Sequence, residues 1–318
     1  INFFLCFKGA PIKTQKEVNQ VGYTEENMEN KNNYVLFTDT DTDMTPAVAE
    51  EYGYNLISMP YTLNGVDYHP YADGKEIDFK KFYDTLRSGA MPTTNALNMN
   101  KYLEYFEPIF ASGKDILYAH FSRAMSGSFD QMDKAIELLK QKYPERQIYL
   151  IDTKGITVGS YNIVGDMYLE GKSAQEIVEW AKTEVDKFPA YFFVNDLTFF
   201  KRSGRVKSIS AIMGNILGIR PILNMDSDGL MSPKFKARGL MGAIDKLMSI
   251  IDELQEDITK HRVIITHSDS METVKLIEQK LLDKYGKDLR IEIVNVNPTA
   301  GSHCGPDGVG VSFHGIHR

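Results

Sequence analysis

From residue 34 onward, short apolar runs alternate with segments whose apolar residues recur at the period of an α-helix. In the first half, the pattern predicts strands over residues 34–37, 55–61, 116–121 and 147–151. The segments between them predict helices over residues 45–52, 78–88, 99–111 and 128–143. Strands that alternate with helices favour right-handed crossovers and a mostly parallel sheet, whose functional loops follow the carboxyl ends of the strands.

The second half of the chain has a different order of predicted helices and strands. Two consecutive helices, over 156–171 and 174–188, precede strands over 190–194, 219–225, 230–237, 262–267, 290–296 and 308–313, with helices over 241–257 and 271–285. Asp226, Asp228 and Gly229 have the composition of a hairpin turn, so this second sheet is expected to be partly antiparallel. The predicted fold class is therefore α/β, with an N-terminal domain over 34–160 and a C-terminal domain over 161–318 that contains a mixed sheet.

Composition narrows the class of protein. A chain of 318 residues is longer than a single hydrophobic core usually accommodates, which agrees with two domains. With 36 basic and 43 acidic residues the net charge is −7, which disfavours nucleic acid as a partner. No apolar run reaches the length of a membrane-spanning helix. The two cysteines, Cys6 and Cys304, form neither a disulfide framework nor a paired-thiolate metal site, which favours a reducing cytoplasm.

Residues 1–33 differ from the rest of the chain, because a short apolar run there is followed by a polar stretch. No basic residue precedes the apolar run, which disfavours a secretory signal. We expect these residues to be a leader or a segment left from cloning, outside the folded core.

The most informative local feature is the turn Ser126-Gly127-Ser128 between a predicted strand and a predicted helix. The first turn of a helix has unpaired amide hydrogens and a partial positive charge, and the two serines add hydroxyl groups. The turn lacks the lysine and the longer glycine-rich loop that a nucleoside triphosphate needs, so a single carboxylate or phosphate fits better. The alternative is an ordinary loop in which Ser128 caps the helix.

Two adjacent threonines, Thr93 and Thr94, precede the helix predicted at 99–111. They are more than a helix cap needs, so one hydroxyl could face the same sheet end as Ser126; capping is the alternative.

The spacing of Asp39, Asp41, Asp43 and Glu50 superficially matches a calcium-binding loop. However, Met44 stands where such a loop requires glycine, and Thr45-Pro46 is typical of a helix start. We therefore interpret the segment as a carboxylate-rich turn between a strand and a helix, and predict no metal site.

Two further residues are candidates for binding an anion. Arg205 follows a glycine at the predicted end of a helix that starts near Asp196. It could bind a phosphate or an acidic partner, or it could interact only with the end of that helix.

His303 lies in a segment rich in glycine and proline, 297–310, which we interpret as a loop of defined shape. It could donate a hydrogen bond to an anion or be a surface histidine. Its neighbour Cys304 has no adjacent base and is treated as incidental.

Six motifs in order give the chain a resemblance to a known family. They are Asp39-x-x-x-Asp43, Pro92-Thr-Thr-Asn95, Ser122-x-x-x-Ser-Gly-Ser128, Leu197-x-x-x-Lys-Arg-Ser-Gly-Arg-Val206, Arg220-Pro-Ile-Leu223 and Gly301-Ser-His-Cys-Gly-Pro306. Over residues 34–318 the chain resembles the DegV family. The resemblance implies two α/β domains with a long-chain fatty acid in a tunnel between them, and no other cofactor. It also implies a non-catalytic subunit that presents the acyl carboxylate to a separate ATP-binding kinase subunit, and it allows transient contact with a membrane.

The same resemblance implies roles for single residues. Thr94, Ser126, Gly127 and His303 would bind the carboxylate, and Arg205 would contact the kinase subunit. The chain departs from the family pattern at Asn95 and Arg123, where serines are usual, and more mildly at Ser128 and Ser203, where threonine and glycine are usual. The departures at Asn95 and Arg123 leave the details of the headgroup site open.

Two other functions compete with lipid binding. A hydrolase or acyltransferase would use Ser126 as nucleophile and His303 as base, but Ser126 lacks the Gly-x-Ser-x-Gly elbow and no acidic partner for His303 is evident. A DNA-binding regulator is disfavoured by the net charge and by the absence of a helix-turn-helix pattern.

Overall fold

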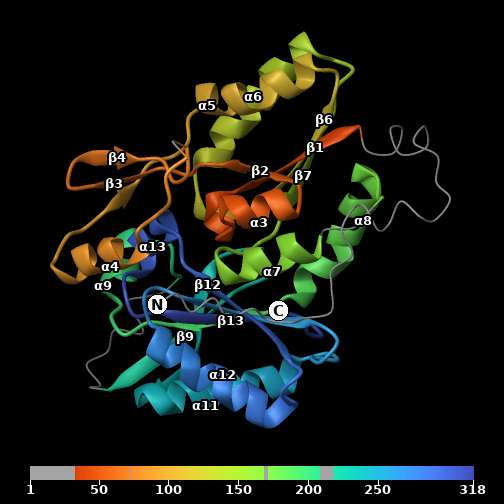
Figure 1. The fold of residues 1–318 in the computed structure, drawn as a ribbon. Helices are drawn as coiled ribbons and strands as arrows, with labels where there is room; N and C mark the ends of the chain where they lie inside the picture. The colour runs from red at the N-terminus through yellow and green to blue at the C-terminus, as the bar shows by residue number, and fades with distance from the viewer. Residues whose placement is uncertain (1–32, 73, 168–170, 208–217) are drawn as a thin grey trace, which may run out of the picture.

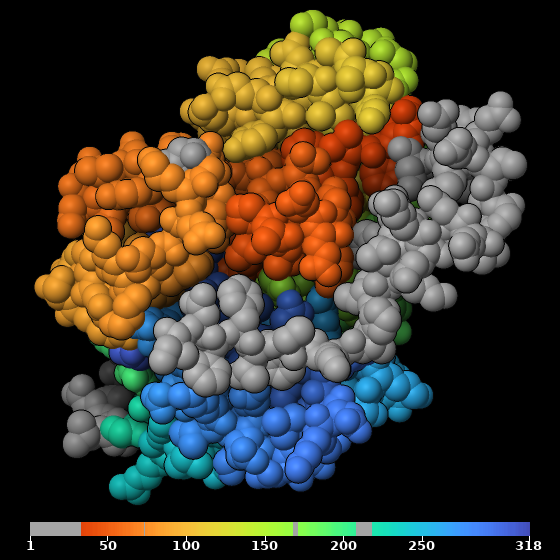
Figure 2. All heavy atoms as spheres, in the orientation of Figure 1, coloured from red at the N-terminus to blue at the C-terminus, as the bar shows by residue number. Residues whose placement is uncertain are grey.

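The computed structural model describes residues 33–72, 74–167, 171–207 and 218–318. Two larger sheets, each with its own helices, lie one above the other in Figure 1. In the space-filling view, the orange and yellow segments around the first sheet form the upper part of this face, and the blue segments around the second sheet form the lower part (Figure 2). The predicted α/β class is confirmed.

The first sheet is parallel, as predicted. It contains β1 (Tyr34–Asp39), β2 (Tyr54–Ile57), β6 (Asp115–His120) and β7 (Ile148–Asp152) in the order β2-β1-β6-β7. Its helices include α3 (Pro46–Glu51), α5 (Met99–Ala111) and α6 (Ser128–Lys142). Because β1, β6 and β7 are parallel neighbours, the loops that follow their carboxyl ends lie side by side.

The second sheet is mixed, also as predicted. Its order is β10-β9-β8-β13-β11-β12, and neighbouring strands run antiparallel except β11 and β12. These strands are β8 (Ala190–Phe193), β9 (Ile219–Met225), β10 (Met231–Arg238), β11 (Arg262–His267), β12 (Arg290–Asn295) and β13 (Val309–Ser312). Helices α11 (Gly239–Leu254) and α12 (Met271–Tyr285) lie along it (Figure 1), and buried residues of both share a core with the sheet. The predicted hairpin is confirmed, because the Asp226 amide donates to the Leu230 carbonyl and Gly229 has a φ of +75°.

Helix α7 (Val158–Asp166) lies between the two sheets (Figure 1). Its residues Val158–Gly165 are buried, as expected for a helix with packing on every side. Helix α8 (Ala174–Glu184) then continues into the short η3 (Val185–Lys187). The predicted domain boundary, between residues 160 and 161, falls inside α7; the division into domains stays a prediction.

A third, smaller sheet was not predicted. It joins β3 (Tyr61–Leu63), β4 (Val66–Tyr68) and β5 (Thr93–Thr94), with α4 (Phe79–Arg87) between the last two in the chain. The prediction of one strand over 55–61 is wrong: β2 ends at Ile57, and Pro60, which lacks an amide hydrogen, separates it from β3. The capping interpretation of the threonines is also wrong, since Asn98 caps α5 by accepting from the Lys101 amide.

The glycine-rich segment near the C-terminus begins with a helix, α13 (Pro298–Cys304), so its interpretation as a loop throughout is wrong. The Asn297 side chain caps this helix by accepting hydrogen bonds from the Thr299 and Ala300 amides, and Pro298 occupies the first helical position. An Asn-Pro pair is a helix-start signal, which the glycines obscured.

A buried aspartate connects the two sheets. The turn after β1 is the short helix η1 (Thr40–Thr42), and it ends at Asp43. Asp43 Oδ1 accepts from the Asn297 amide and Asn297 Nδ2, both at 2.8 Å, and Asp43 Oδ2 accepts from Thr266 Oγ1 at 3.2 Å. Thr45 and Pro46 start α3 as predicted, so the carboxylate-rich turn is confirmed.

Candidate functional site

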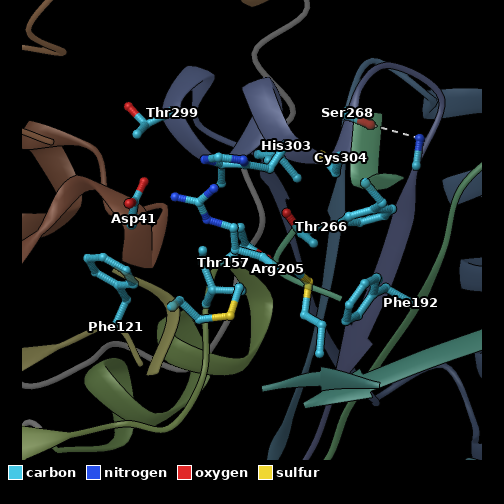
Figure 3. A pocket seen from close by; sticks show the side chains of 18 of the residues that line it. Asp41, Phe121, Thr157, Phe192, Arg205, Thr266, Ser268, Thr299, His303 and Cys304 are labelled. Atoms are coloured by element: carbon cyan, nitrogen blue, oxygen red, sulfur yellow. Dashed lines mark hydrogen bonds between the residues drawn. The ribbon is translucent and has the colours of Figure 1, made fainter. Parts of the chain in front are cut away.

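A cavity lies between the loops of the first sheet and the face of the second, and includes about 860 Å³ of space when its mouth is counted (Figure 3). Much of its wall is apolar, and the large apolar side chains are Met59, Phe121, Met125, Ile156, Phe192, Phe193, Phe200 and Met231. The sequence did not indicate that β8 and β10 would face this space, because a short apolar strand does not show which side meets a ligand.

Polar groups from distant parts of the chain meet in this cavity. Thr94 comes from β5 and His303 from α13, and Thr94 Oγ1 lies 2.8 Å from His303 Nε2. With the proton on Nε2, the imidazole donates to the Thr94 oxygen and leaves the Thr94 hydroxyl hydrogen free for another acceptor. The structure therefore brings two of the predicted headgroup residues into direct contact.

Ser126 also lines the cavity, from the loop between the short helix η2 (Arg123–Met125) and α6. Its hydroxyl donates to Ser128 Oγ at 3.0 Å and accepts from the Ser128 amide at 3.1 Å. Ser128 Oγ in turn accepts from the Leu97 amide at 2.9 Å, so the prediction that Ser128 caps α6 through its side chain is wrong. Gly127 is not among the lining residues, although both its neighbours are.

The surroundings of His303 keep its ring neutral. Burial is the largest cause, and the positive charges of Arg205 and Arg202 act in the same direction, lowering the pKa of His303 to about 4. A neutral imidazole at neutral pH can take part in the Thr94 hydrogen bond without adding a charge to the cavity. The interpretation of His303 as a surface histidine is therefore wrong.

Arg205 stands at the cavity and at the end of a helix. Helix α9 (Thr198–Ser203) ends at Gly204, and Arg205 Nη1 donates to the Ser203 carbonyl oxygen. Figure 3 shows the rest of the side chain extending into the cavity, toward His303. Arg205 therefore donates a hydrogen bond to a carbonyl at the helix end and also places an exposed cation at the site.

The sequence did not identify two of the polar residues that line the cavity, Asp41 and Thr299, as site residues. Asp41 comes from η1 and Thr299 from the first turn of α13. The signal for Asp41 was present, because it follows β1, the neighbour of the strand that precedes Ser126. Thr299 was hidden because the helix in which it lies was interpreted as a loop.

Cys304 also lines the cavity. Burial, followed by the charge of Asp43, raises the pKa of its thiol to about 12, which keeps the sulfur protonated and unreactive. Within the described ranges, no group of three or more histidine, cysteine, aspartate or glutamate side chains could hold a metal ion.

Comparison with known families shows the family to which the chain belongs. A sequence model described as "Uncharacterised protein, DegV family" matches residues 33–315. This chain belongs to the DegV family. A DegV domain-containing protein of Clostridium perfringens is 30% identical over 286 residues, which cover 89% of this chain and 97% of the relative. The family resemblance carried by the six motifs is therefore confirmed.

Solved structures of DegV proteins share the fold. A structure described as fatty acid binding of a DegV family protein from Thermus thermophilus has a TM-score of 0.77 at 21% identity, covering 89% of this chain and 99% of that one. A fatty acid binding DegV family protein from Streptococcus agalactiae has a TM-score of 0.77 at 23% identity, with the same coverage. Among the described residues of this DegV chain, no helix is both long and apolar enough to cross a membrane.

Proposed function

We propose that this DegV protein binds a long-chain fatty acid in the cavity between its two sheets. The acyl chain would lie against the phenylalanine and methionine side chains, and the carboxylate at the Thr94–His303 pair and Ser126. The observation that carries the proposal is the cavity itself, which combines a mostly apolar wall with a cluster of neutral hydrogen-bonding groups. The two DegV structures described as fatty acid binding support the same assignment.

The energetics favour a lipid over a small polar anion. A sixteen-carbon acid buries about 14 methylene groups, which contribute about 11 kcal/mol at ~0.8 kcal/mol each before the costs of association. The hydroxyl groups contribute less to the affinity than the acyl chain does. They prevent the carboxylate from being buried without hydrogen bonds.

We further propose that the protein is not itself the catalyst but presents the acyl carboxylate, in the cytoplasm, to a separate ATP-binding kinase subunit. The family resemblance supports this role, and the exposed Arg205 beside the cavity offers a contact for the partner or for the forming acyl phosphate. A serine hydrolase finds no comparable support. The Ser126 hydroxyl is hydrogen-bonded to Ser128 and the His303 ring to Thr94, which is not the serine–histidine pair that such an enzyme needs.

Lipid extraction tests the binding function. The purified protein is denatured, its extract is analysed by mass spectrometry, and the delipidated protein is melted with and without added palmitate. We expect a long-chain fatty acid in the extract and a higher melting temperature with palmitate, because a ligand that binds only the folded state stabilises it. Methyl palmitate, which has the same chain without the charge, is the control for headgroup recognition. An extract without fatty acid, together with melting curves that palmitate leaves unchanged, would reject the proposal.

A further inference from the structure

Asp41 carries a buried oxygen atom without a hydrogen-bond partner in the part of the chain that the structure describes. The residue is only 5% exposed, and its Oδ1 atom has no hydrogen-bond partner among the described residues. Its neighbours in the same turn differ. Asp39 Oδ2 accepts from the Tyr118 hydroxyl at 2.9 Å and from the Phe121 amide at 3.1 Å, and both Asp43 oxygens accept hydrogen bonds. A buried polar atom without a partner is costly, so one in a cavity wall points to a ligand group.

The surroundings of Asp41 favour the protonated form of its carboxyl group. Burial, and then the charges of Asp39 and Asp43, raise the pKa of Asp41 well above its ordinary value, while a hydrogen bond from the Asn297 side chain opposes them. The protonated group has an O–H that can donate to an anion. An ionised Asp41 would instead repel a carboxylate in the same cavity.

The position of Asp41 places it beside the headgroup end of the cavity. The preceding residue, Thr40, accepts from the Met59 amide through Oγ1 at 3.0 Å, and the Met59 carbonyl accepts from Thr299 Oγ1 at 2.8 Å. Thr299 lies one helical turn before His303, on the same side of α13. In Figure 3, Asp41 lies across from Thr299 and His303, with its carboxyl group directed toward α13.

We propose that Asp41 is a headgroup-binding residue, whose protonated carboxyl group donates a hydrogen bond to the carboxylate of the bound acid. The inference rests on the proposed fatty-acid function and deepens it: the site recognises a carboxylate with a carboxylic acid in addition to hydroxyl groups. Such an acid–carboxylate pair carries one negative charge, which the Arg205 cation at the same cavity partly balances.

Titration of the delipidated full-length protein with palmitate tests this inference, and 1-hexadecanol serves as the uncharged ligand of equal length. Asp41→Ala removes the donor, and we expect about a tenfold weaker affinity for palmitate with about a twofold change or less for hexadecanol. Asp41→Asn retains an N–H donor of the same shape, so its palmitate affinity should stay within about twofold of wild type. Asp245→Asn removes one acidic charge from an exposed residue of α11 that does not line the cavity, and this variant should bind both ligands as wild type does.

The outcomes separate this inference from the function on which it rests. If wild type binds no palmitate, the fatty-acid function itself fails. If wild type binds palmitate and Asp41→Ala binds it equally well or more tightly, only the role of Asp41 is overturned. A loss in Asp41→Asn as large as that in Asp41→Ala also overturns it, because a donor would then not be what matters. Should Asp41→Ala fail to fold, Asp41→Leu, which fills the same space with apolar atoms, takes its place under the same criteria.

Discussion

Thr94 Oγ1 and His303 Nε2 lie 2.8 Å apart although 209 residues separate them in the chain. The contact joins the small third sheet to α13, and both side chains face the cavity. Because the ring is neutral, the pair works as a relay of hydrogen bonds. The imidazole orients the threonine hydroxyl, and the hydroxyl is the group that can reach a ligand.

The first prediction concerns this hydroxyl. Thr94→Ala should weaken fatty acid binding by about 1–3 kcal/mol, the usual contribution of one hydrogen bond to a charged group. Binding of a fatty alcohol should change much less, because the acyl chain contributes most of the affinity for both ligands. Thr94→Ser keeps the hydroxyl and is the matched control. Calorimetric titration of the three proteins measures the effect, and equal affinities for the acid would show that the carboxylate does not lie at Thr94.

The second prediction concerns the protonation of His303. Its pKa of about 4, caused first by burial and then by Arg205 and Arg202, means that the ring should stay neutral from pH 8 down to pH 5. An unfolded chain takes up this proton near pH 6.5. The unfolded state therefore binds more protons between about pH 4 and 6.5, so the contribution of His303 to stability is full above that window and weakens as the pH falls through it.

Nuclear magnetic resonance of the His303 ring measures this directly. We expect its ring resonances to remain constant from pH 8 to pH 5. Arg205→Ala should raise the pKa only partly toward 6.5, because burial is the larger cause. A ring that titrates near pH 6.5 in wild type would contradict the neutral relay.

The sequence allowed the elements of the two main sheets to be predicted, because their patterns are local. The strand β11 and the helix α12 were predicted with the bounds that the structure has. Local patterns failed where the chain makes short, non-local structure. The strand β5 has only the residues Thr93 and Thr94, and it forms only because Tyr61 and Thr62 lie beside it. No window of sequence around the threonines contains that information.

The candidate site was predictable from the sequence only in part of its residues, and not in its geometry. The sequence motifs predict five site residues. Four of them, Thr94, Ser126, Arg205 and His303, line one cavity, and Gly127 does not. Which of them touch was not predictable, because Thr94 and His303 meet only once the small third sheet and α13 are in place. The absence of a partner for Asp41 Oδ1 among the described residues likewise depends on which carboxyl groups of this turn the neighbouring strands and α13 satisfy.

The third prediction concerns the close packing of α13. A Cβ atom added at Gly301 would lie 2.7 Å from the Tyr83 hydroxyl oxygen and 3.0 Å from Phe82 Cε1. Tyr83 is fully buried and donates to the Val296 carbonyl at 2.8 Å, so it cannot move freely. Gly301→Ala should therefore lower the free energy of unfolding by about 1–3 kcal/mol, as overpacking of a core does.

Gly242→Ala is the control for this substitution. Gly242 lies within α11, and the nearest atom to its added Cβ would be Ala237 Cβ at 3.9 Å, which is ordinary contact. Alanine favours a helix over glycine by about 0.8–1.0 kcal/mol, so this variant should be as stable as wild type or more stable. Denaturant unfolding compares the two variants, and a Gly301→Ala protein as stable as wild type would mean that α13 can move away from Tyr83 and Phe82 at little cost.

The last prediction separates two roles of Arg205. If its guanidinium contacts the kinase subunit or the forming acyl phosphate, Arg205→Ala should bind fatty acid normally yet lose most of its support of phosphorylation by the ATP-binding subunit. If it serves only the Ser203 carbonyl at the end of α9, the variant should lose a few tenths to about 1 kcal/mol of stability and support the kinase fully. Lys201→Ala, which removes an exposed cation from the same helix, is the matched control and should leave phosphorylation unchanged. The measurement is acyl phosphate formation with each lipid-loaded variant, at equal bound fatty acid. Undiminished formation with Arg205→Ala would leave the arginine as a helix-end residue, because a partner contact at the cavity mouth has to affect the transfer step.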